Sequence, residues 1–244
     1  MSEDGIIKLG KWSVGELERL MEEASSLPET GPRIERISGM LLGTPYRAST
    51  LIGSDRIPER LVIDLEGVDC FTLIDYVEAM RLSRSLPGFR DALIRVRYRE
   101  GRVSFKGRNH FFTDWLYSPR NPVADVTREI GGVECRSAVK RLNLKKDGSL
   151  FLPGIEVTER EITYIPGESI DSVLEKRIRE GDYIGIYTFE EGLDVSHVGI
   201  FVGRENTGRL RHASSSYESR KVVDQPFEDY VSRKPGIIVV RPGL

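Results

Sequence analysis

The sequence predicts an α+β fold with a largely antiparallel sheet, and two observations support this prediction. Helical periodicity dominates the first hundred residues, whereas β-rich runs separated by turns dominate from about residue 155 onward. Helices followed by strands are typical of the α+β class. Because no internal repeat, low-complexity tract or linker divides the chain, we expect a single domain over residues 1–244, with a helical N-terminal part at 12–42.

Two helices are predicted before residue 43. Ser13 and Glu16 have the spacing of a capping box, and apolar residues from Val14 to Ala24 then recur with helical periodicity. This helix ends at Leu27-Pro28. A second helix opens near Pro32 and stops at Gly43, because proline favours a first turn and glycine follows a last one.

The next segment predicts one strand, two helices and an irregular excursion. Leu61–Asp64 reads as a short strand. Asp69 is a candidate N-cap for a long apolar helix that ends before Pro87, and the spacing within Phe89–Val96 indicates a shorter helix. Residues 106–135 are polar and carry Gly, Pro and Asn, which favours irregular structure.

The C-terminal part is expected to supply the sheet. Its β-rich runs are Ile184–Tyr187, Val198–Val202 and Ile237–Val240. A helix is predicted between the strands at Ser169–Arg179.

Composition excludes several classes of protein. The 244 residues carry 36 Lys+Arg and 38 Asp+Glu, so the formal charge of −2 gives no overall field that would favour nucleic acid or anionic lipid. No apolar run approaches the ~18 residues that a membrane-spanning helix needs. Residues 1–10 show no basic region, apolar stretch or cleavage site of a secretory signal. We therefore expect either a cytoplasmic protein or one whose leader was removed.

The nucleophile candidate is Cys70, which lies at the first turn of the predicted long helix. Free N–H groups and the partial positive charge of a helix start favour a thiolate, and the same N–H groups can hold an oxyanion. The alternative is a buried structural thiol, because the flank at Phe71–Ile74 is apolar. Cys135 has no motif around it and is expected to be structural.

Two histidines in the strand region are the candidate bases. His197 and His212 lie on strands that we expect to be joined by a turn around Asn206-Thr207-Gly208, which would place their imidazoles side by side. A histidine can take a proton from a thiol and return it to a leaving amine, while a second polar group fixes its tautomer. The alternative is two half-exposed histidines with solvent partners.

These residues together resemble the NlpC superfamily of papain-like bacterial cell-wall peptidases. The shared order is a cysteine at a helix start, Gly181-Asp182 at a strand start, then His-Val-Gly-Ile and His-Ala-Ser. The segment from Leu42 to Tyr46 resembles the superfamily's Gly-x-Pro-Tyr motif. More specific strings resemble one branch, the N-acetylmuramoyl-L-alanine amidase-like family: VDCFT (68–72), RNHFFTDW (108–115), GLDVSHVGI (192–200), RHASS (211–215) and the closing GIIVVRP (236–242).

The resemblance implies a papain-like fold and a cysteine amidase. Its substrate would be peptidoglycan fragments, or muropeptides, cut between N-acetylmuramic acid and L-alanine. By motif, Cys70 would be the nucleophile, His197 the general base and acid, and His212 the orienting group. Tyr46 and Asp69 would lie near the oxyanion or the substrate. An internal segment, about residues 87–160, would be a family-specific insertion.

Further substrate contacts are candidates only. In the RNHFFTDW string, Arg108, Asn109 and His110 would bind a sugar N-acetyl group or a peptide carboxylate, and Trp115 would stack on a pyranose. The alternative for this string is that its aromatic residues anchor the excursion to the core while the polar ones satisfy backbone groups. Beside the histidines, the resemblance adds Asp194, Ser196 and Ser214 as substrate-binding candidates.

Three other functions stay open from the sequence. One is a different reaction at the same cysteine site, either cleavage at a D-Glu–diamino acid bond or acyl transfer. Another is zinc hydrolysis, although the three histidines lie far apart and none forms a His-Glu-x-x-His helix. The last is a cell-wall binding module without turnover. We expect no metal, no other cofactor and a monomer, acting in the cell envelope if a leader was removed.

Overall fold

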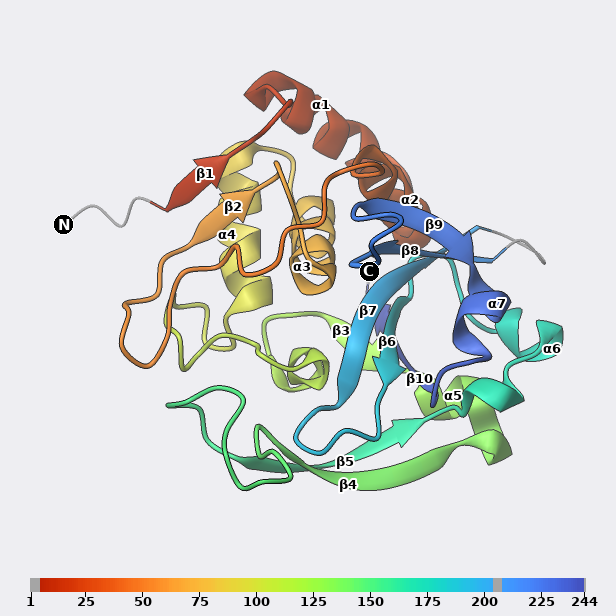
Figure 1. Ribbon diagram of the computed structural model, residues 1–244. Coiled ribbons are helices and arrows are strands. Elements are labelled where there is room, and N and C mark those ends of the chain that lie inside the picture. The colour runs from red at the N-terminus through yellow and green to blue at the C-terminus, as the bar shows by residue number, and fades with distance from the viewer. Residues whose placement is uncertain (1–4, 204–207, 244) are drawn as a thin grey trace.

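The computed structural model describes residues 5–203 and 208–243 as a central sheet with helices on both faces (Figure 1). The six-stranded sheet has the order β3-β10-β6-β7-β8-β9, and every pairing in it is antiparallel. The predicted antiparallel sheet is therefore confirmed. Its strands are β3 (Val123–Asp125), β6 (Tyr183–Tyr187), β7 (Val195–Val202), β8 (Arg209–Ala213), β9 (Val222–Pro226) and β10 (Ile237–Pro242).

The helical layer lies on one face of this sheet and largely follows the sequence prediction. Ser13 closes a capping box with Glu16, as predicted, and Pro87 lies in the first turn of the fourth helix instead of only following the third. Figure 1 shows these helices grouped around the third of them, Cys70–Arg81. The four helices are α1 (Val14–Ser25), α2 (Thr30–Met40), α3 (Cys70–Arg81) and α4 (Leu86–Arg97).

Alternation along the strands builds two apolar cores. On β7, Val198 and Ile200 face the helical layer, whereas Phe201 packs on the opposite face. The same alternation holds in β6 and β10, so both faces of the sheet are buried. Short helices cover the second face: α5 (Thr127–Gly131), α6 (Ser172–Glu175) and α7 (Phe227–Val231).

Some predicted elements are wrong in extent. The helix expected at Ser169–Arg179 is reduced to α6, because Asp171 caps one short turn and the chain then closes tight turns that bury Ile178 before β6 begins. The excursion at 106–135 is not wholly irregular, since it contains β3, α5 and the 3₁₀ helices η1 (Phe112–Tyr117) and η2 (Gly132–Glu134).

Two small sheets were not predicted as such. The strand expected at Leu61–Asp64 is β2 (Val62–Asp64), and it pairs in parallel with β1 (Ile6–Lys8). A hairpin of β4 (Arg136–Leu142) and β5 (Thr158–Tyr164) runs along the lower edge of the molecule in Figure 1. No helix in the described residues is both long and apolar enough to cross a membrane.

Candidate active site

Cys70 is the first residue of α3, and Asp69 caps this helix. The Asp69 carboxylate accepts the Thr72 N–H at 2.8 Å, and the Thr72 hydroxyl oxygen accepts the Asp69 N–H at 2.9 Å. This reciprocal capping fixes the first turn of the helix. It also places a carboxylate next to the thiol.

Two histidines form a hydrogen-bonded pair beside α3. His197 Nε2 lies 2.7 Å from His212 Nδ1, and the planes of the rings stand at 90°. The second ring nitrogen of His212, Nε2, lies 2.7 Å from Gln225 Oε1. The structure therefore brings the imidazoles together as predicted. The turn expected at Asn206-Thr207-Gly208 lies largely outside the described residues.

The strands separate where the histidines lie. Pairing between β7 and β8 covers Ile200–Val202, so His197 and Val198 precede the start of that ladder. β7 also pairs with β6 along its other edge. There the register shifts at Ile186/Tyr187, which leaves Ser196 as an extra residue just before His197. Bulges of this kind redirect neighbouring side chains. In this opening, the Val198 N–H interacts with the Cys70 sulfur.

Burial reverses the expected effect of the helix start on Cys70. Burial and then the neighbouring Asp69 charge raise the pKa of the thiol to about 12. Three backbone N–H groups lower this pKa, but by less than burial and Asp69 raise it; they belong to Val198, Cys70 and Phe71. The free protein therefore holds a neutral thiol at pH 7, and the predicted resting thiolate is wrong.

The histidine pair is neutral as well. Burial lowers the pKa of His197 to about 3, and repulsion by a protonated His212 and by Lys234 would act in the same direction. Burial also lowers the pKa of His212, although Gln225 and Asp224 partly oppose it. A neutral imidazole can accept a proton, so the pair is in the correct state to act as a base at pH 7.

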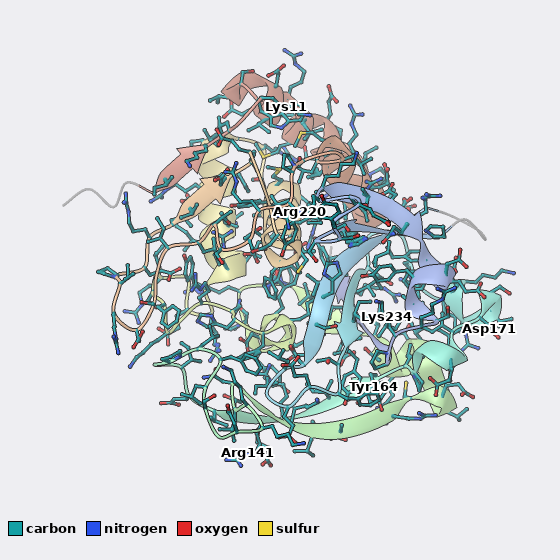
Figure 2. The ribbon with its side chains drawn as sticks, in the orientation of Figure 1. Lys11, Arg141, Tyr164, Asp171, Arg220 and Lys234 are labelled. Atoms are coloured by element: carbon teal, nitrogen blue, oxygen red, sulfur yellow. The ribbon has the colours of Figure 1, made fainter. Side chains whose placement is uncertain are left out.

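Two tyrosines flank the thiol. Burial raises the pKa of Tyr46 and of Tyr230, and the nearby Cys70 adds to both shifts. Tyr46 is half-buried, and Arg220 lies over its ring at 5.3 Å. Tyr230 on α7 packs 5.1 Å from the His212 ring, and Lys234 lies 4.9 Å from its centroid. Figure 2 labels the two cations, Arg220 and Lys234.

Gln225, Tyr230 and Lys234 were missed by sequence reasoning. The signal for Gln225 is register: Leu210 pairs with Gln225 and His212 with Val223, so the glutamine is a diagonal neighbour of His212 on the same face. No motif indicated Tyr230 or Lys234.

Several predicted substrate-binding residues are buried instead. Asp194 is 1% exposed, and its carboxylate accepts the N–H and hydroxyl of Thr113 at 2.7 and 2.8 Å. This contact ties η1 to the start of β7. Ser214 is also buried and accepts the Ser216 N–H at 3.3 Å. Ser196 is exposed beside His197.

In the RNHFFTDW string, Trp115 anchors the excursion to the core, which is the alternative to sugar binding. Its ring is 0% exposed and packs against Phe71 and Tyr183, so it does not offer a face to a sugar. The large aromatic ring is instead part of the core between η1, α3 and β6.

The polar residues of that string are held internally. Arg108 forms an ion pair with Glu59 at 3.3 Å, and Asn109 Nδ2 donates to the Val96 carbonyl at 2.8 Å. His110 Nε2 lies 2.8 Å from the Phe105 carbonyl oxygen. These contacts order the excursion beside α4, and Arg108 and His110 keep some exposure.

Other candidate ligands lie apart. Within residues 5–203 and 208–243, no three His, Cys, Asp or Glu side chains are grouped to hold a metal ion. Cys135 is half-buried, and its thiol donates to the Thr127 carbonyl at 3.4 Å, away from Cys70 on the α5 side.

The chain is similar to several solved structures. A protein from Legionella pneumophila superposes with a TM-score of 0.76 at 23% identity, covering 94% of each chain, which supports the fold. An N-acetylmuramoyl-L-alanine amidase from Bacteroides uniformis superposes with a TM-score of 0.70 at 28% identity, covering 94% of this chain and 100% of the other. A Bacteroides fragilis protein named as a xylanase candidate gives a TM-score of 0.65 at 26% identity, covering 84% and 98%.

The family assignment comes from sequence. None of the curated protein sequences matches the chain significantly. A family model described as AmiA-like, N-acetylmuramoyl-L-alanine amidase-like, matches residues 36–237, which contain Cys70, His197, His212 and Gln225. The match covers well over half of the chain, and so the chain belongs to the AmiA-like family of N-acetylmuramoyl-L-alanine amidase-like hydrolases.

Proposed function

We propose that this protein is a cysteine amidase that cuts muropeptides between N-acetylmuramic acid and L-alanine. The observation that carries the proposal is the hydrogen-bonded His197–His212 pair at the separated strand ends where Val198 meets the Cys70 sulfur. The amidase-like family and the amidase name of the Bacteroides uniformis structures support the same reaction class.

In the proposed mechanism, the Cys70 thiol is neutral until substrate binds. Its sulfur attacks the lactyl carbonyl carbon while the thiol proton moves to His197. The N–H groups at the start of α3, together with the Tyr46 hydroxyl, hold the oxyanion. When the C–N bond breaks, His197 gives that proton to the departing amine of L-alanine, and a thioester remains.

Water completes the cycle. His197 takes a proton from the water molecule, whose oxygen attacks the thioester carbonyl. Breakage of the C–S bond releases the muramic carboxylic acid, which ionises in solution, and His197 returns its proton to the Cys70 sulfur. Each half of the reaction thus uses the same base, with His212 keeping the His197 ring in orientation.

The proposal extends to the fold and the setting. We infer a papain-like, NlpC-type architecture, because a cysteine at a helix start lies against the antiparallel strand that carries His197, where the Val198 N–H interacts with its sulfur. Residues 1–244 would act as one amidase domain in the cell envelope, with residues 87–160 as the family-specific part.

Mass spectrometry of a muropeptide mixture tests the reaction. Wild-type protein should release intact stem peptides that begin with L-alanine, and Cys70→Ala should release none while keeping the wild-type melting temperature. Cleavage after D-Glu would instead identify the endopeptidase, shortened glycan chains a glycosidase, and unchanged masses a binding module.

Inhibitors separate the two amidase chemistries. Iodoacetamide at alkaline pH should abolish activity by alkylating Cys70, whereas EDTA should leave it intact. Loss of activity with EDTA and wild-type activity of Cys70→Ala would together identify a zinc amidase and contradict the cysteine mechanism.

A further inference from the structure

Gln225 makes a hydrogen bond that fixes the position of one proton. Its Oε1 lies 2.7 Å from His212 Nε2, and a carbonyl oxygen can only accept. His212 Nε2 must therefore carry a proton. Burial keeps His212 neutral at pH 7, and a neutral imidazole has one N–H only, so its Nδ1 is an acceptor.

The proton position in His212 determines the proton position in His197. Because His212 Nδ1 accepts, His197 Nε2, which lies 2.7 Å away, must donate. His197 is neutral too, so its remaining nitrogen, Nδ1, carries no proton. A base that is to take a proton from Cys70 needs such a free lone pair, and His197 Nε2 is already occupied by His212.

We propose that Gln225 is a positioning residue that sets the tautomers of both histidines, so that His197 Nδ1 is the acceptor for the Cys70 proton. This inference rests on the proposed function for its catalytic consequence. The tautomers themselves are a property of the free protein.

The structure holds Gln225 in place for this role. Gln225 is on β9, the edge strand that pairs with β8 from Arg209 to Ala213. The adjacent Asp224 carboxylate accepts two hydrogen bonds from Arg211 at 2.8 Å, which ties β9 to β8 next to the histidine. His212 itself is only 2% exposed, so water does not readily replace the amide.

An amide differs from a carboxylate in its effect on the proton. When Cys70 gives its proton to His197, the positive charge is shared by two rings that end on a neutral acceptor. Gln225 cannot take the proton away, so it stays available for the leaving amine. A carboxylate at this position would keep the same tautomers but stabilise the imidazolium.

Nitrogen-15 NMR of histidine-labelled protein reads the tautomers directly. At pH 7, wild-type protein and Cys70→Ala should both show protonated Nε2 and unprotonated Nδ1 for His197 and His212. His110 is the internal reference, because its Nε2 lies 2.8 Å from the Phe105 carbonyl oxygen. Protonated Nδ1 in His212 would mean that Gln225 donates its amide N–H, and would overturn the proposal.

Three variants test the consequence. Gln225→Leu should give mixed tautomers and lower kcat by about 10- to 100-fold with little change in KM, since a buried N–H loses its acceptor. Gln225→Glu restores the acceptor, so the tautomers and most of kcat should return. Glu228→Gln, an exposed change three residues further on, is the control and should leave both unchanged. Unaltered tautomers in Gln225→Leu would contradict the proposal.

The Glu variant has a second readout that a structural role would not produce. Its carboxylate should raise the pKa of the histidine pair and move the acid limb of the kcat profile to higher pH. The other charged or titratable groups around the pair, which are unchanged in this variant, are Asp224, Lys234, Tyr230 and Cys70. An acid limb that stays in place would count against the proposal.

The NMR result and the amidase assay fail independently. If the tautomers are as inferred but no muropeptide is cut, the proposed function fails and the assignment of Gln225 stands. If muropeptides are cut but the tautomers do not depend on residue 225, the amidase stands and this inference is wrong.

Discussion

At Cys70, two local effects on the thiol oppose each other, and burial is the stronger. A helix start stabilises a negative charge by typically 0.3–1 kcal/mol, which is less than one pKa unit. Burial shifts the pKa of an ionisable group by up to 3–5 units. The Asp69 cap adds a like charge, and the pKa of Cys70 consequently reaches about 12.

Alkylation kinetics test this pKa. The rate at which iodoacetamide modifies Cys70, read by mass spectrometry of its peptide, should rise about tenfold per pH unit from pH 7 to 10 without a plateau, because only the thiolate reacts. Asp69→Asn keeps a capping oxygen but removes the charge, so its curve should move to lower pH. A plateau below pH 8 in the wild type would contradict the raised pKa.

His110 gives a prediction about acid stability. Burial lowers its pKa from 6.5 to about 4, and repulsion by Arg108 assists. A group whose folded pKa is depressed contributes stability above its unfolded pKa and loses it as the pH falls toward the folded value. His110→Gln retains a donor for the Phe105 carbonyl, so it should be less acid-sensitive than wild type.

The size of this pH effect is the difference in the free energy of unfolding between His110→Gln and wild type. The free energy of unfolding of the variant relative to wild type should rise on acidification from pH 6.5 to 4, by at most about 1.4 kcal/mol per pH unit. Urea unfolding at several pH values measures it, and parallel stability curves would contradict the prediction.

At the scale of elements, a buried charge pair within α3 accepts a hydrogen bond from β6 and so joins the helix to the sheet. Arg81 donates twice to the Glu78 carboxylate at 2.7 Å, and the Tyr183 hydroxyl on β6 donates to the same carboxylate at 2.8 Å. All three side chains are nearly or fully buried. This link keeps the C-terminal end of α3 against β6, while Cys70 at the other end meets β7.

Removing one partner of this pair should be costly. Arg81→Met leaves Glu78 with a charge in the interior, and we expect the free energy of unfolding to fall by about 3–5 kcal/mol in urea titrations. Combining it with Glu78→Leu removes the orphaned charge, so the double variant should be more stable than the single one. A loss below about 1 kcal/mol for Arg81→Met would contradict this account.

At the scale of the whole molecule, the sheet separates two cores, and the site receives residues from both sides. Cys70 comes from α3 in the helical layer, whereas Tyr230 comes from α7 on the opposite face. The two side chains lie near each other, since Cys70 adds to the raised pKa of Tyr230. The paired part of β7 and β8 begins only at Ile200, so the site lies at the unpaired end of this ladder, next to His197.

Trp115 tests how the 3₁₀ helix η1 is joined to the rest of the molecule. Its ring is fully buried between Phe71 and Tyr183, so Trp115→Ala should lower stability by about 3–5 kcal/mol through the cavity that it leaves. Trp115→Phe keeps an aromatic filler and should fold, with KM for muropeptides unchanged. A higher KM at wild-type stability would indicate sugar binding instead.

Local chemistry explains how much of the fold was predictable. The cap at Ser13, the cap at Asp69 and the strand runs of β6, β7 and β10 all rest on neighbours within a few residues, and the structure has each of them. The helix expected at Ser169–Arg179 failed because its apolar residues are buried by tight turns, a result that depends on packing against other segments.

The α+β order of elements, the position of Cys70 behind its cap and the histidine pair on neighbouring strands all follow from the amino-acid sequence. The neutral thiol, the interior positions of Trp115 and Asp194 and the hydrogen bond between His212 and Gln225 depend on the folded arrangement. The physical reason is that pKa, burial and strand register depend on segments distant in sequence. Capping and periodicity depend on adjacent residues alone.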